Sequence, residues 1–470
     1  MMDSIQMLIQ LIGGLGLFLY GMKLMGDGLE NAAGDRLKGI LEKVTSNKFI
    51  GVLVGAIVTA IIQSSSATTV MVVSFVNAGL MSLVQAVGVI MGANIGTTIT
   101  AQMVSLDLDA IAPLFVGIGA IAMLICKKKK SKDIFSIVLG FGILFLGMNT
   151  MSSAMAPLGE SETFVDIIYF IGDNKLLGVL AGLVMTAIVQ SSSATTGILV
   201  ALASTGSIDM NAALPIIFGC NIGTCVTALL ASAGANRTAK KAGLVHLLFN
   251  TIGVLIFLPF MNIVIDLIQK ISPDQVTRQV ANAHTIFNVT VTLILLPLSN
   301  FLVLLVNKIM PGDSKIEKEG AIYLDKKLLE TPVVAVNQVF KETLRMGELA
   351  KNNLEFSMEA FLEEDEEKIQ KVYKNEKTIN ILEKEITDYL VDLSSHELPE
   401  NDSKILSATF HVINDLERIG DHAENIVELA TEKINTKAKI ESDAKNELIT
   451  MYKKSLEAVK IALDSYEKKD

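Results

Sequence analysis

The chain has 470 residues, of which 50% are hydrophobic and 19% are charged, with a formal net charge of −10 and a mean hydropathy of +0.48. This average excludes an ordinary soluble domain. Apolar stretches of roughly membrane-spanning length predict a polytopic membrane protein. These stretches lie at 5–25, 111–126, 134–151, 242–265 and 285–307. Residues 1–22 lack the basic start and the cleavage site of a signal peptide, so we expect them to form the first helix.

The composition changes near residue 311, where the chain becomes rich in lysine and glutamate. The segment "KIMPGDSKIEKEG" at 308–320 has the proline, glycine and charge of a linker. We therefore expect a membrane domain at 1–310, a linker at 311–321 and a cytoplasmic helical bundle at 322–470. The expected fold class is all-α, a polytopic helical membrane domain joined to a soluble bundle.

The membrane domain contains an internal duplication. "AIIQSSSATT" at 60–69 returns as "AIVQSSSATT" at 187–196, and "GANIGTTITA" at 92–101 returns as "GCNIGTCVTA" at 219–228. Upstream, "GLGLFLYGMKLM" at 14–25 matches "GFGILFLGMNTM" at 140–151. Three blocks in register indicate two repeats, at about 5–130 and 134–265. An extra helix is expected at about 283–308.

The polar Gln-Ser run interrupts an apolar segment in each repeat. The apolar arms around the first run, 49–62 and 67–80, are each too short to span a bilayer. We therefore expect two re-entrant hairpins with their tips inside the membrane. Three crossings separate the repeats, at 5–25, about 83–104 and about 110–126, and an odd number inverts the second repeat relative to the first.

The charge distribution fits this topology. With the N-terminus outside, basic residues collect in the cytoplasm, whereas the segments 105–109, 158–174 and 268–282 lie outside. Seven crossings of the cytoplasmic (inner) membrane result, the last at about 285–307, and the C-terminal domain lies in the cytoplasm. The Gly-rich helices at 83–104 and 210–231 could be broken. The basic residues are Lys23, Arg36, Lys38, Lys43, Lys48, Lys127–Lys130, Lys132, Arg237, Lys240 and Lys241.

The hairpin tips are the first candidate site. Non-helical backbone at membrane depth is tolerated where it lines a cavity or is packed in protein. Helix N-termini at such a tip favour an anion, and serine and threonine hydroxyls can turn lone pairs toward a cation. The alternative is that the hydroxyls serve only in helix packing, but a ten-residue cluster repeated at a fixed offset favours a midplane site for an anion and small cations.

Two further polar motifs accompany the tips. Asn94 and Asn221 sit between glycines in the "GxNIGT" blocks, where unwound carbonyls, amide oxygens and threonine hydroxyls would suit Na⁺. A close helix contact with Asn as a hydrogen-bonding residue is the alternative. The echo "HLLFN" at 246–250 and "HTIFN" at 284–288 places His and Asn on one helix face. Proton handling remains open for these, and a structural hydrogen bond to the hairpins is favoured.

Two QSSSATT runs, each followed by GxNIGT within a duplicated membrane domain, resemble the type II sodium–phosphate cotransporter family over about residues 5–310. The resemblance implies symport of inorganic phosphate with Na⁺ by alternating access around the two tips. The assignment of individual residues to each ion is our hypothesis. For phosphate they are Gln63, Ser64, Ser65, Ser66, Gln190, Ser191, Ser192 and Ser193. For Na⁺ they are Thr68, Thr69, Asn94, Thr97, Thr98, Thr195, Thr196, Asn221 and Thr224, with His246, Asn250, His284 and Asn288 in support.

Neither repeat core carries an intramembrane carboxylate, so the Na⁺:phosphate stoichiometry and the electrogenicity stay open. Transport of another anion, phosphate efflux, and a phosphate sensor that does not transport are the alternative functions. We expect no enzyme, because the chain has no nucleotide-binding loop, zinc motif or Ser-His-Asp arrangement, and nothing in it indicates nucleic-acid binding.

The C-terminal third reads as three or four long helices over 326–470. "NDLERIGDHAENIVELA" at 414–430 and "NEKTINILEKEI" at 375–386 resemble the paired helices of PhoU-like domains, which are associated with phosphate regulation. In that family acidic pairs can bind metal, and Glu417, Asp421 and Glu376 match, whereas Asn380 stands where an Asp is expected. His422 and Glu424 could contribute, and a solvated helix face is the alternative. A homodimer or a regulatory partner also remains open.

Overall fold

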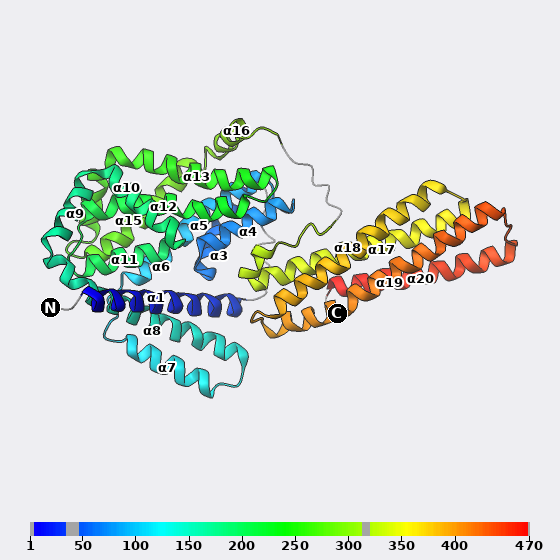
Figure 1. Ribbon diagram of the computed structural model, residues 1–470, viewed down its shortest axis with the longest axis horizontal. Coiled ribbons are helices and arrows are strands. Elements are labelled where there is room, and N and C mark those ends of the chain that lie inside the picture. Colours follow the sequence, from blue (N-terminus) through cyan, green and yellow to red (C-terminus); the bar gives the residue numbers. More distant parts are fainter. Residues whose placement is uncertain (1–3, 34–46, 313–319, 469–470) are drawn as a thin grey trace. The chain divides into compact units, whose positions relative to one another are not determined.

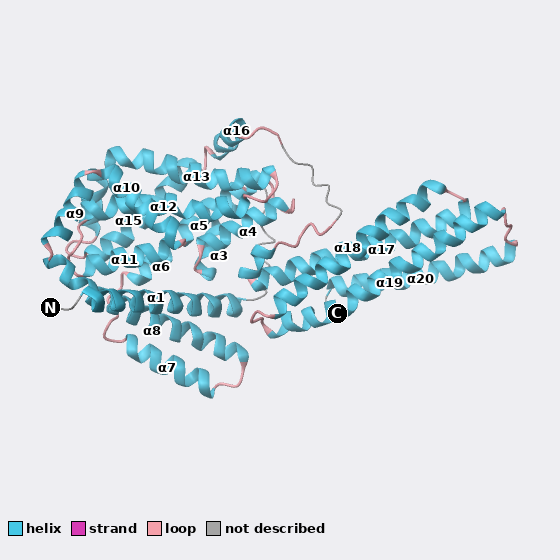
Figure 2. Cartoon of the chain, viewed as in Figure 1, coloured by secondary structure: helices cyan, strands magenta, loops and turns pink. Residues whose placement is uncertain are grey.

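The computed structural model describes residues 4–33, 47–312 and 320–468, and divides into two compact units, Met1–Lys315 and Ile316–Asp470 (Figure 1). Each unit is described by itself. In the described residues every regular element is a helix, which confirms the all-α prediction (Figure 2). The predicted cytoplasmic residues Arg36, Lys38 and Lys43 lie outside the described part.

The first unit follows the duplicated sequence. Its first half comprises α1 (Ser4–Ala33), α3 (Lys48–Ile62), α4 (Ser65–Asn77), α5 (Leu83–Gly96), α6 (Thr98–Val104) and α7 (Ala112–Ile125). The second half comprises α8 (Lys129–Met155), η1 (Ala156–Glu160), α9 (Glu162–Asp173), α10 (Lys175–Val189), α11 (Ser192–Ser204), α12 (Met210–Ser232), α13 (Arg237–Phe257), η2 (Leu258–Phe260) and α14 (Met261–Ile271). Helices α15 (Val276–Leu295) and α16 (Ser299–Ile309) complete the unit.

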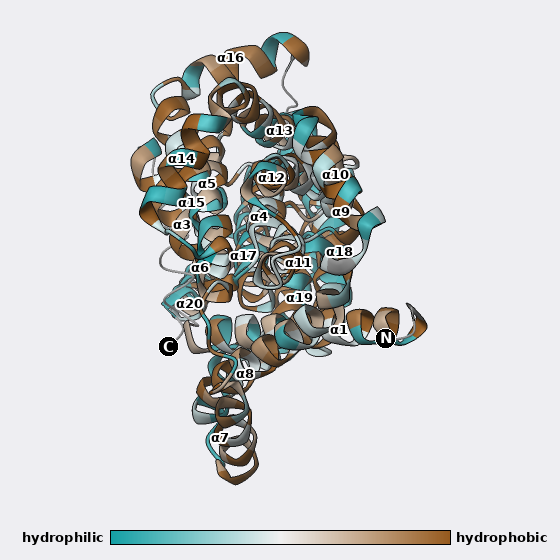
Figure 3. Ribbon diagram, turned by 90° about the vertical axis from the view of Figure 1, so that its left-hand side faces the viewer, coloured by the Kyte–Doolittle hydropathy of each residue, from teal (hydrophilic) through white to brown (hydrophobic). Residues whose placement is uncertain are grey.

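The membrane-spanning prediction is confirmed, with a different distribution of crossings. Among the described residues, five helical stretches are long and apolar enough to span, at Ile5–Ala33, Leu83–Val104, Lys129–Gly159, Met210–Ser232 and Arg237–Ile271. Two further pairs are bent, α9 with α10 by 110° and α15 with α16 by 82°, which allows up to seven spans. The expected crossing at 110–126 is α7, a helix of only 14 residues, and the expected last crossing is the bent α15–α16 pair. Most of α7 has the colour of hydrophobic residues in Figure 3.

Glycines set the same helix contact in each half. Helix α3 packs on α5, and α10 packs on α12. At each of four glycines in these contacts, an added Cβ would overlap a backbone carbonyl oxygen of the facing helix. Close backbone approach through small residues is how membrane helices associate without a hydrophobic driving force. The four are Gly55 and Gly92 in the first half and Gly182 and Gly219 in the second.

The second unit is a helical bundle. It contains η3 (Lys326–Glu330), α17 (Pro332–Glu363), α18 (Glu366–Ser394), α19 (Glu400–Thr436) and α20 (Ser442–Lys468). Helices α17, α18 and α19 contact one another, and α20 packs on α17. A buried cluster that includes Ala360, Val372, Ala423 and Val427 joins the first three helices, because the apolar residues of each recur on one helix face.

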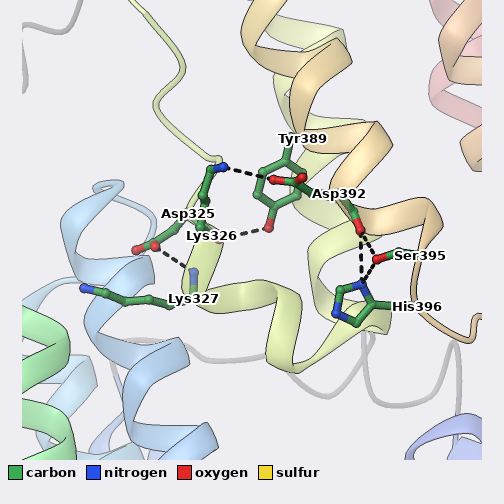
Figure 4. A network of polar contacts seen from close by, with 7 residues as sticks. All are labelled: Asp325, Lys326, Lys327, Tyr389, Asp392, Ser395 and His396. Atoms are coloured by element: carbon green, nitrogen blue, oxygen red, sulfur yellow. Dashed lines mark hydrogen bonds and ion pairs between the residues drawn. The ribbon is translucent and has the colours of Figure 1, made fainter.

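The segment that precedes α17 is fastened to the bundle. Glu342, fully buried, accepts hydrogen bonds from the backbone N–H groups of Ile322 at 2.8 Å and Tyr323 at 2.6 Å. Further along, the Tyr389 hydroxyl donates to the Asp325 carbonyl at 2.9 Å, and Lys326 pairs with Asp392 at 3.0 Å (Figure 4). These contacts make 320–331 part of the bundle.

Candidate functional site

Two Gln-Ser bends have the same backbone. In the first bend, residues 60–69, α3 ends at Gln63 with a left-handed φ of 60°, and Ser64 begins α4 by accepting from the Ala67 amide at 3.1 Å. In the second bend, residues 187–196, Gln190 has φ of 56° and Ser191 accepts from the Ala194 amide at 3.2 Å. A left-handed conformation at a residue other than glycine is unfavourable by about 1–2 kcal/mol, so the same costly geometry is made twice.

Each bend exposes the amino end of a helix. The amides at the start of an α-helix have no intrahelical acceptor. Ser64 takes one of them in α4, the Ala67 amide, through its hydroxyl, and Ser191 takes the Ala194 amide in α11. The amides of Ser65 and Ser66, and of Ser192 and Ser193, remain at the positive end of a helix dipole, which suits an anion.

Threonine hydroxyls join the two arms of each bend. Thr59 donates to Thr68 at 2.9 Å, and Thr186 donates to Thr195 at 3.1 Å. Thr68 in turn donates to the Ser64 carbonyl, and Thr195 to the Ser191 carbonyl, both at 3.1 Å. Our sequence analysis missed Thr59 and Thr186. Their signal was their matched position just before each QSSS run.

In the first half, the Asn94 motif closes into a buried network. The Asn94 side-chain oxygen lies 3.2 Å from His246 Nε2, and its amide donates to Asn250 Oδ1 at 3.4 Å. All three side chains are buried. One helical turn on, Thr97 donates to the Ser65 hydroxyl at 3.1 Å. The first GxNIGT block therefore contacts both the first bend and the HLLFN motif.

Asn221 of the second GxNIGT block and the polar residues of α15 form no such network in the part of the chain that the structure describes. The Asn221 amide donates only to Ile217 O of its own helix, at 2.9 Å. His284, Asn288 and Thr292 share one buried face of α15. Among the described residues, both ring nitrogens of His284, Asn288 Oδ1 and Thr292 Oγ1 have no hydrogen-bond partner. Buried polar groups without a protein partner are usually satisfied by water or by a ligand.

The two glutamines also differ. Gln63 is buried, and its Oε1 accepts from Thr100 at 2.8 Å. Gln190 is exposed. The first bend reaches the other half as well, because Thr227 donates to the Ser66 hydroxyl at 3.3 Å. Thr100 and Thr227 were missed from sequence, although they occupy the same place in the two GxNIGT blocks.

The helices that follow the bends each pack on the opposite repeat. Helix α4 contacts α12 and α13, and α11 contacts α6. The structure thus brings the first bend together with Asn94, Thr97 and the second half's Thr227. Thr98 donates to the Ile95 carbonyl at the end of α5 at 2.7 Å, and Thr224 donates to the Cys220 carbonyl of its own helix at 2.9 Å, which leaves their lone pairs available.

The bundle contains a cluster of carboxylates. Oxygens of Glu376, Asp421 and Glu424 lie within 4.8 Å of one another. Glu417, which the sequence placed in this group, is outside that cluster, and Glu424 takes its place. Glu376 is buried, and among the described residues neither of its carboxylate oxygens has a partner at hydrogen-bond geometry. The nearby Asn353 amide donates to Val372 O. Burial, and then the nearby charges of Asp421, Glu424 and Glu417, raise the pKa of Glu376 to about 7.

Comparison with known sequences assigns the first unit. A sequence model described as Na⁺/Pi-cotransporter matches residues 17–153 and again 154–272, and each match contains one of the two Gln-Ser bends. The chain belongs to the Na⁺/Pi-cotransporter family. A second model, the PhoU domain, matches residues 343–430 of the bundle. The resemblance found from the motifs is thereby confirmed for both units.

Individual relatives of this Na⁺/Pi-cotransporter family member cover one or both units. A Bacillus subtilis protein, "Uncharacterized protein YqeW", is 32% identical over 257 residues, 55% of this chain and 83% of its own. An Escherichia coli protein, "Putative inorganic phosphate export protein YjbB", is 27% identical over 460 residues, 98% of this chain and 84% of its own. The rat "Sodium-dependent phosphate transport protein 2A" is 37% identical over 133 residues, 26% of this chain and 21% of its own. No solved structure matches.

Proposed function

We propose that this protein is a Na⁺-coupled transporter of inorganic phosphate, with the two Gln-Ser bends as re-entrant hairpin tips of two inverted repeats. The observation that carries the proposal is that the same bend is built twice. Each copy presents two serine amides at a helix N-terminus beside serine hydroxyls. Such an arrangement can replace the hydration of an oxyanion from two directions.

In this proposal Na⁺ is held by uncharged oxygens. Asn94, Thr97 and Thr98 in the first half match Asn221 and Thr224 in the second, and the unpaired Asn288 and Thr292 oxygens add acceptors on α15. A hydroxyl that donates to a helix carbonyl turns its lone pairs away from that bond, toward a cation. The residues assigned to Na⁺ include no carboxylate, so in this proposal the charge that balances Na⁺ comes from the phosphate. A net charge moved with each cycle would be worth about 2.3 kcal/mol per 100 mV.

Contacts between loops support the proposed sidedness. Lys48 donates to Pro297 O at 3.3 Å, and the Asn236 side chain donates to Asn77 O at 2.8 Å. The positive-inside pattern places Lys48, Asn77 and Asn236 at the cytoplasmic ends of their helices, and Pro297 follows the end of α15. We propose a cytoplasmic (inner) membrane protein with its N-terminus outside and its bundle in the cytoplasm.

The test is radiolabelled phosphate flux in proteoliposomes that contain the full chain. Uptake driven by an inward Na⁺ gradient, and lost when choline replaces Na⁺, is the expected result. Equal uptake in choline would refute Na⁺ coupling. Binding of phosphate with no flux in either direction would favour a sensor, and selective flux of another anion would replace phosphate as the cargo.

Phosphate export is the second candidate, because a relative aligned over nearly this whole chain carries an export protein's name. A symporter is reversible, so phosphate flux measured separately in each direction across the membrane distinguishes uptake from export. Vesicles preloaded with phosphate, with Na⁺ on one side at a time, show which gradient direction gives the faster flux. Faster phosphate flux away from the side proposed to be cytoplasmic than toward it would support phosphate export in the cell.

We propose that the bundle regulates the transporter and that its Glu376, Asp421 and Glu424 cluster can take a divalent cation. A buried carboxylate with unpaired oxygens is unfavourable unless it is protonated or bound to a cation. Calorimetric titration of Mn²⁺, Fe²⁺ or Mg²⁺ into the full chain, with Glu376→Gln as the control, tests this. Equal heats from both proteins, or none at millimolar metal, would leave the cluster as a structural feature.

A further inference from the structure

A cavity of about 1040 Å³ lies where four separate segments of the first unit meet. It is lined by the end of α6 and its following loop, the second half of α8, the end of α11, and the loop that leads into α15. Hydrogen bonds join these walls: Ser204 on α11 donates to Ser152 on α8 at 2.8 Å, and Gln102 on α6 donates to Asn282 on α15 at 3.0 Å.

The cavity lies close to the bends. Val104, in its lining, is one helical turn after Thr100, which donates to Gln63 of the first bend. That turn is about 6 Å along the helix. Val200, also in the lining, lies eight residues after Ser192 on α11, roughly 12 Å along the axis from the second bend. Both bends therefore connect to the cavity through short helix segments.

The charges of the lining are unequal. Asp107, Asp109 and Asp274 carry the negative charges, and Arg278 carries the only positive charge among the lining residues. The aspartates are exposed, and partial burial, then the charge of Asp107, raises the pKa of Asp109. A concave surface of one sign concentrates ions of the opposite sign. By this rule the lining would favour cations over free anions.

We propose that this cavity is the vestibule by which ions reach the bends from the non-cytoplasmic side, and that its aspartates select Na⁺-like cations over free anions. The inference rests on the proposed transport function, and it adds the route and the charge preference of that route. Loops 105–109 and 268–282, which the positive-inside pattern places outside, both contribute to the lining.

The test is the accessibility of a single cysteine at Ser204→Cys, in the full chain with Cys126→Ser. Cys220 and Cys225 are fully buried and stay in place. Membrane-impermeant methanethiosulfonate reagents with a trimethylammonium or a sulfonate group are applied to intact cells. Each rate is normalised to its rate with a free thiol. The cationic reagent should react about tenfold faster, and 1 M salt should reduce the ratio.

Charge variants sharpen the measurement. Asp107→Asn with Asp109→Asn and Asp274→Asn should bring the ratio close to one, whereas Arg278→Gln should raise it about twofold to threefold. Thr163→Cys, an exposed position on α9 outside the lining, is the matched control, and its ratio should not respond to the triple change. If the triple variant does not fold, Asp107→Asn alone should lower the ratio.

Three outcomes would overturn the inference: equal or faster reaction of the anionic reagent, reaction only in inside-out vesicles, or no reaction from either face. Because labelling does not require transport, these outcomes are separate from a failure of phosphate flux. In active protein, the triple variant should also raise the external Na⁺ concentration for half-maximal uptake about threefold. An unchanged Na⁺ requirement would argue against the charge preference.

Discussion

The two Gln-Ser bends have nearly the same sequence and backbone, but their surroundings differ. The first is tied to its neighbours by side-chain hydrogen bonds, from Thr100 to Gln63, from Thr97 to Ser65 and from Thr227 to Ser66. The structure describes no such bond for Gln190, Ser192 or Ser193 of the second bend. Nearly identical decapeptides can thus form one firmly held bend and one loosely held bend, because residues far away in the chain provide hydrogen-bond partners for only one of them.

The two halves also differ at the start of the helix that precedes each bend, α3 in the first half and α10 in the second. Lys48 opens α3 and contacts Pro297 O and Ser299 Oγ at the break between α15 and α16. Its counterpart Lys175 opens α10 and lines a cavity of about 500 Å³ beside Asp173 and Asp209. In a transporter, the loosely held element is the one that can change position at low energetic cost.

The largest expected effect comes from removing Asn94. Asn94→Ala leaves His246 and Asn250 without their buried partner, so we expect a loss of about 2–4 kcal/mol of stability. Asn221→Ala removes one bond to its own helix and should lose about 1 kcal/mol or less. Thermal unfolding of the purified full chains, without Na⁺ or phosphate, compares them. Equal losses would show that the two halves are equally well packed.

The serines at the two helix N-termini come next. Ser65→Ala and Ser192→Ala should each weaken apparent phosphate affinity about tenfold, since a hydrogen bond to a charged group is worth about 1.5–3 kcal/mol. Only Ser65→Ala should also lower thermal stability, because the Thr97 hydroxyl loses its acceptor. Thr163→Ala, at an exposed position on α9 outside the cavity lining, is the control for uptake assays. If expression and affinity fall together in both variants, the serines serve packing alone.

The strained glutamines give a smaller difference. Glycine adopts positive φ freely, so Gln190→Gly should relieve strain without losing a contact. Gln63→Gly relieves the same strain but removes the bond to Thr100. We expect Gln63→Gly to be less stable than Gln190→Gly by about 1 kcal/mol, measured by thermal unfolding. The reverse order would place the firmer anchoring at the second bend.

The smallest effect on stability is expected from the lysines that begin α3 and α10. Lys48→Met removes a cation from the Pro297 carbonyl and should lower stability by about 0.5–1 kcal/mol. Lys175→Met, the matched change at α10, should have almost no effect. Hydrogen exchange of the α15–α16 break provides a local readout. Faster exchange there in the Lys175 variant, and not in the Lys48 variant, would contradict this assignment.

Local signals made the bends predictable. The repeated QSSS run specifies a helix end followed at once by a capped helix start, and the glycine-rich blocks specify close helix contacts. The bundle was predictable for the same reason, since its helices have a strong period. The bent α15–α16 pair and the short α7 were not, because apolar composition does not specify where a span breaks or how it crosses. Likewise, Glu424 replaced Glu417 in the acidic cluster, since their spacing along α19 did not decide which one faces Glu376.

By itself the sequence determined the all-α class, the duplication, the two units and the residues that form each bend, because these follow from hydropathy, helix capping and self-similarity over short distances. Only the tertiary structure decided that Asn94 pairs with His246, that Thr227 contacts Ser66, and that three aspartates share a cavity. These contacts join residues far apart in the chain. Their geometry depends on how helices pack, which two nearly identical motifs cannot specify differently on their own.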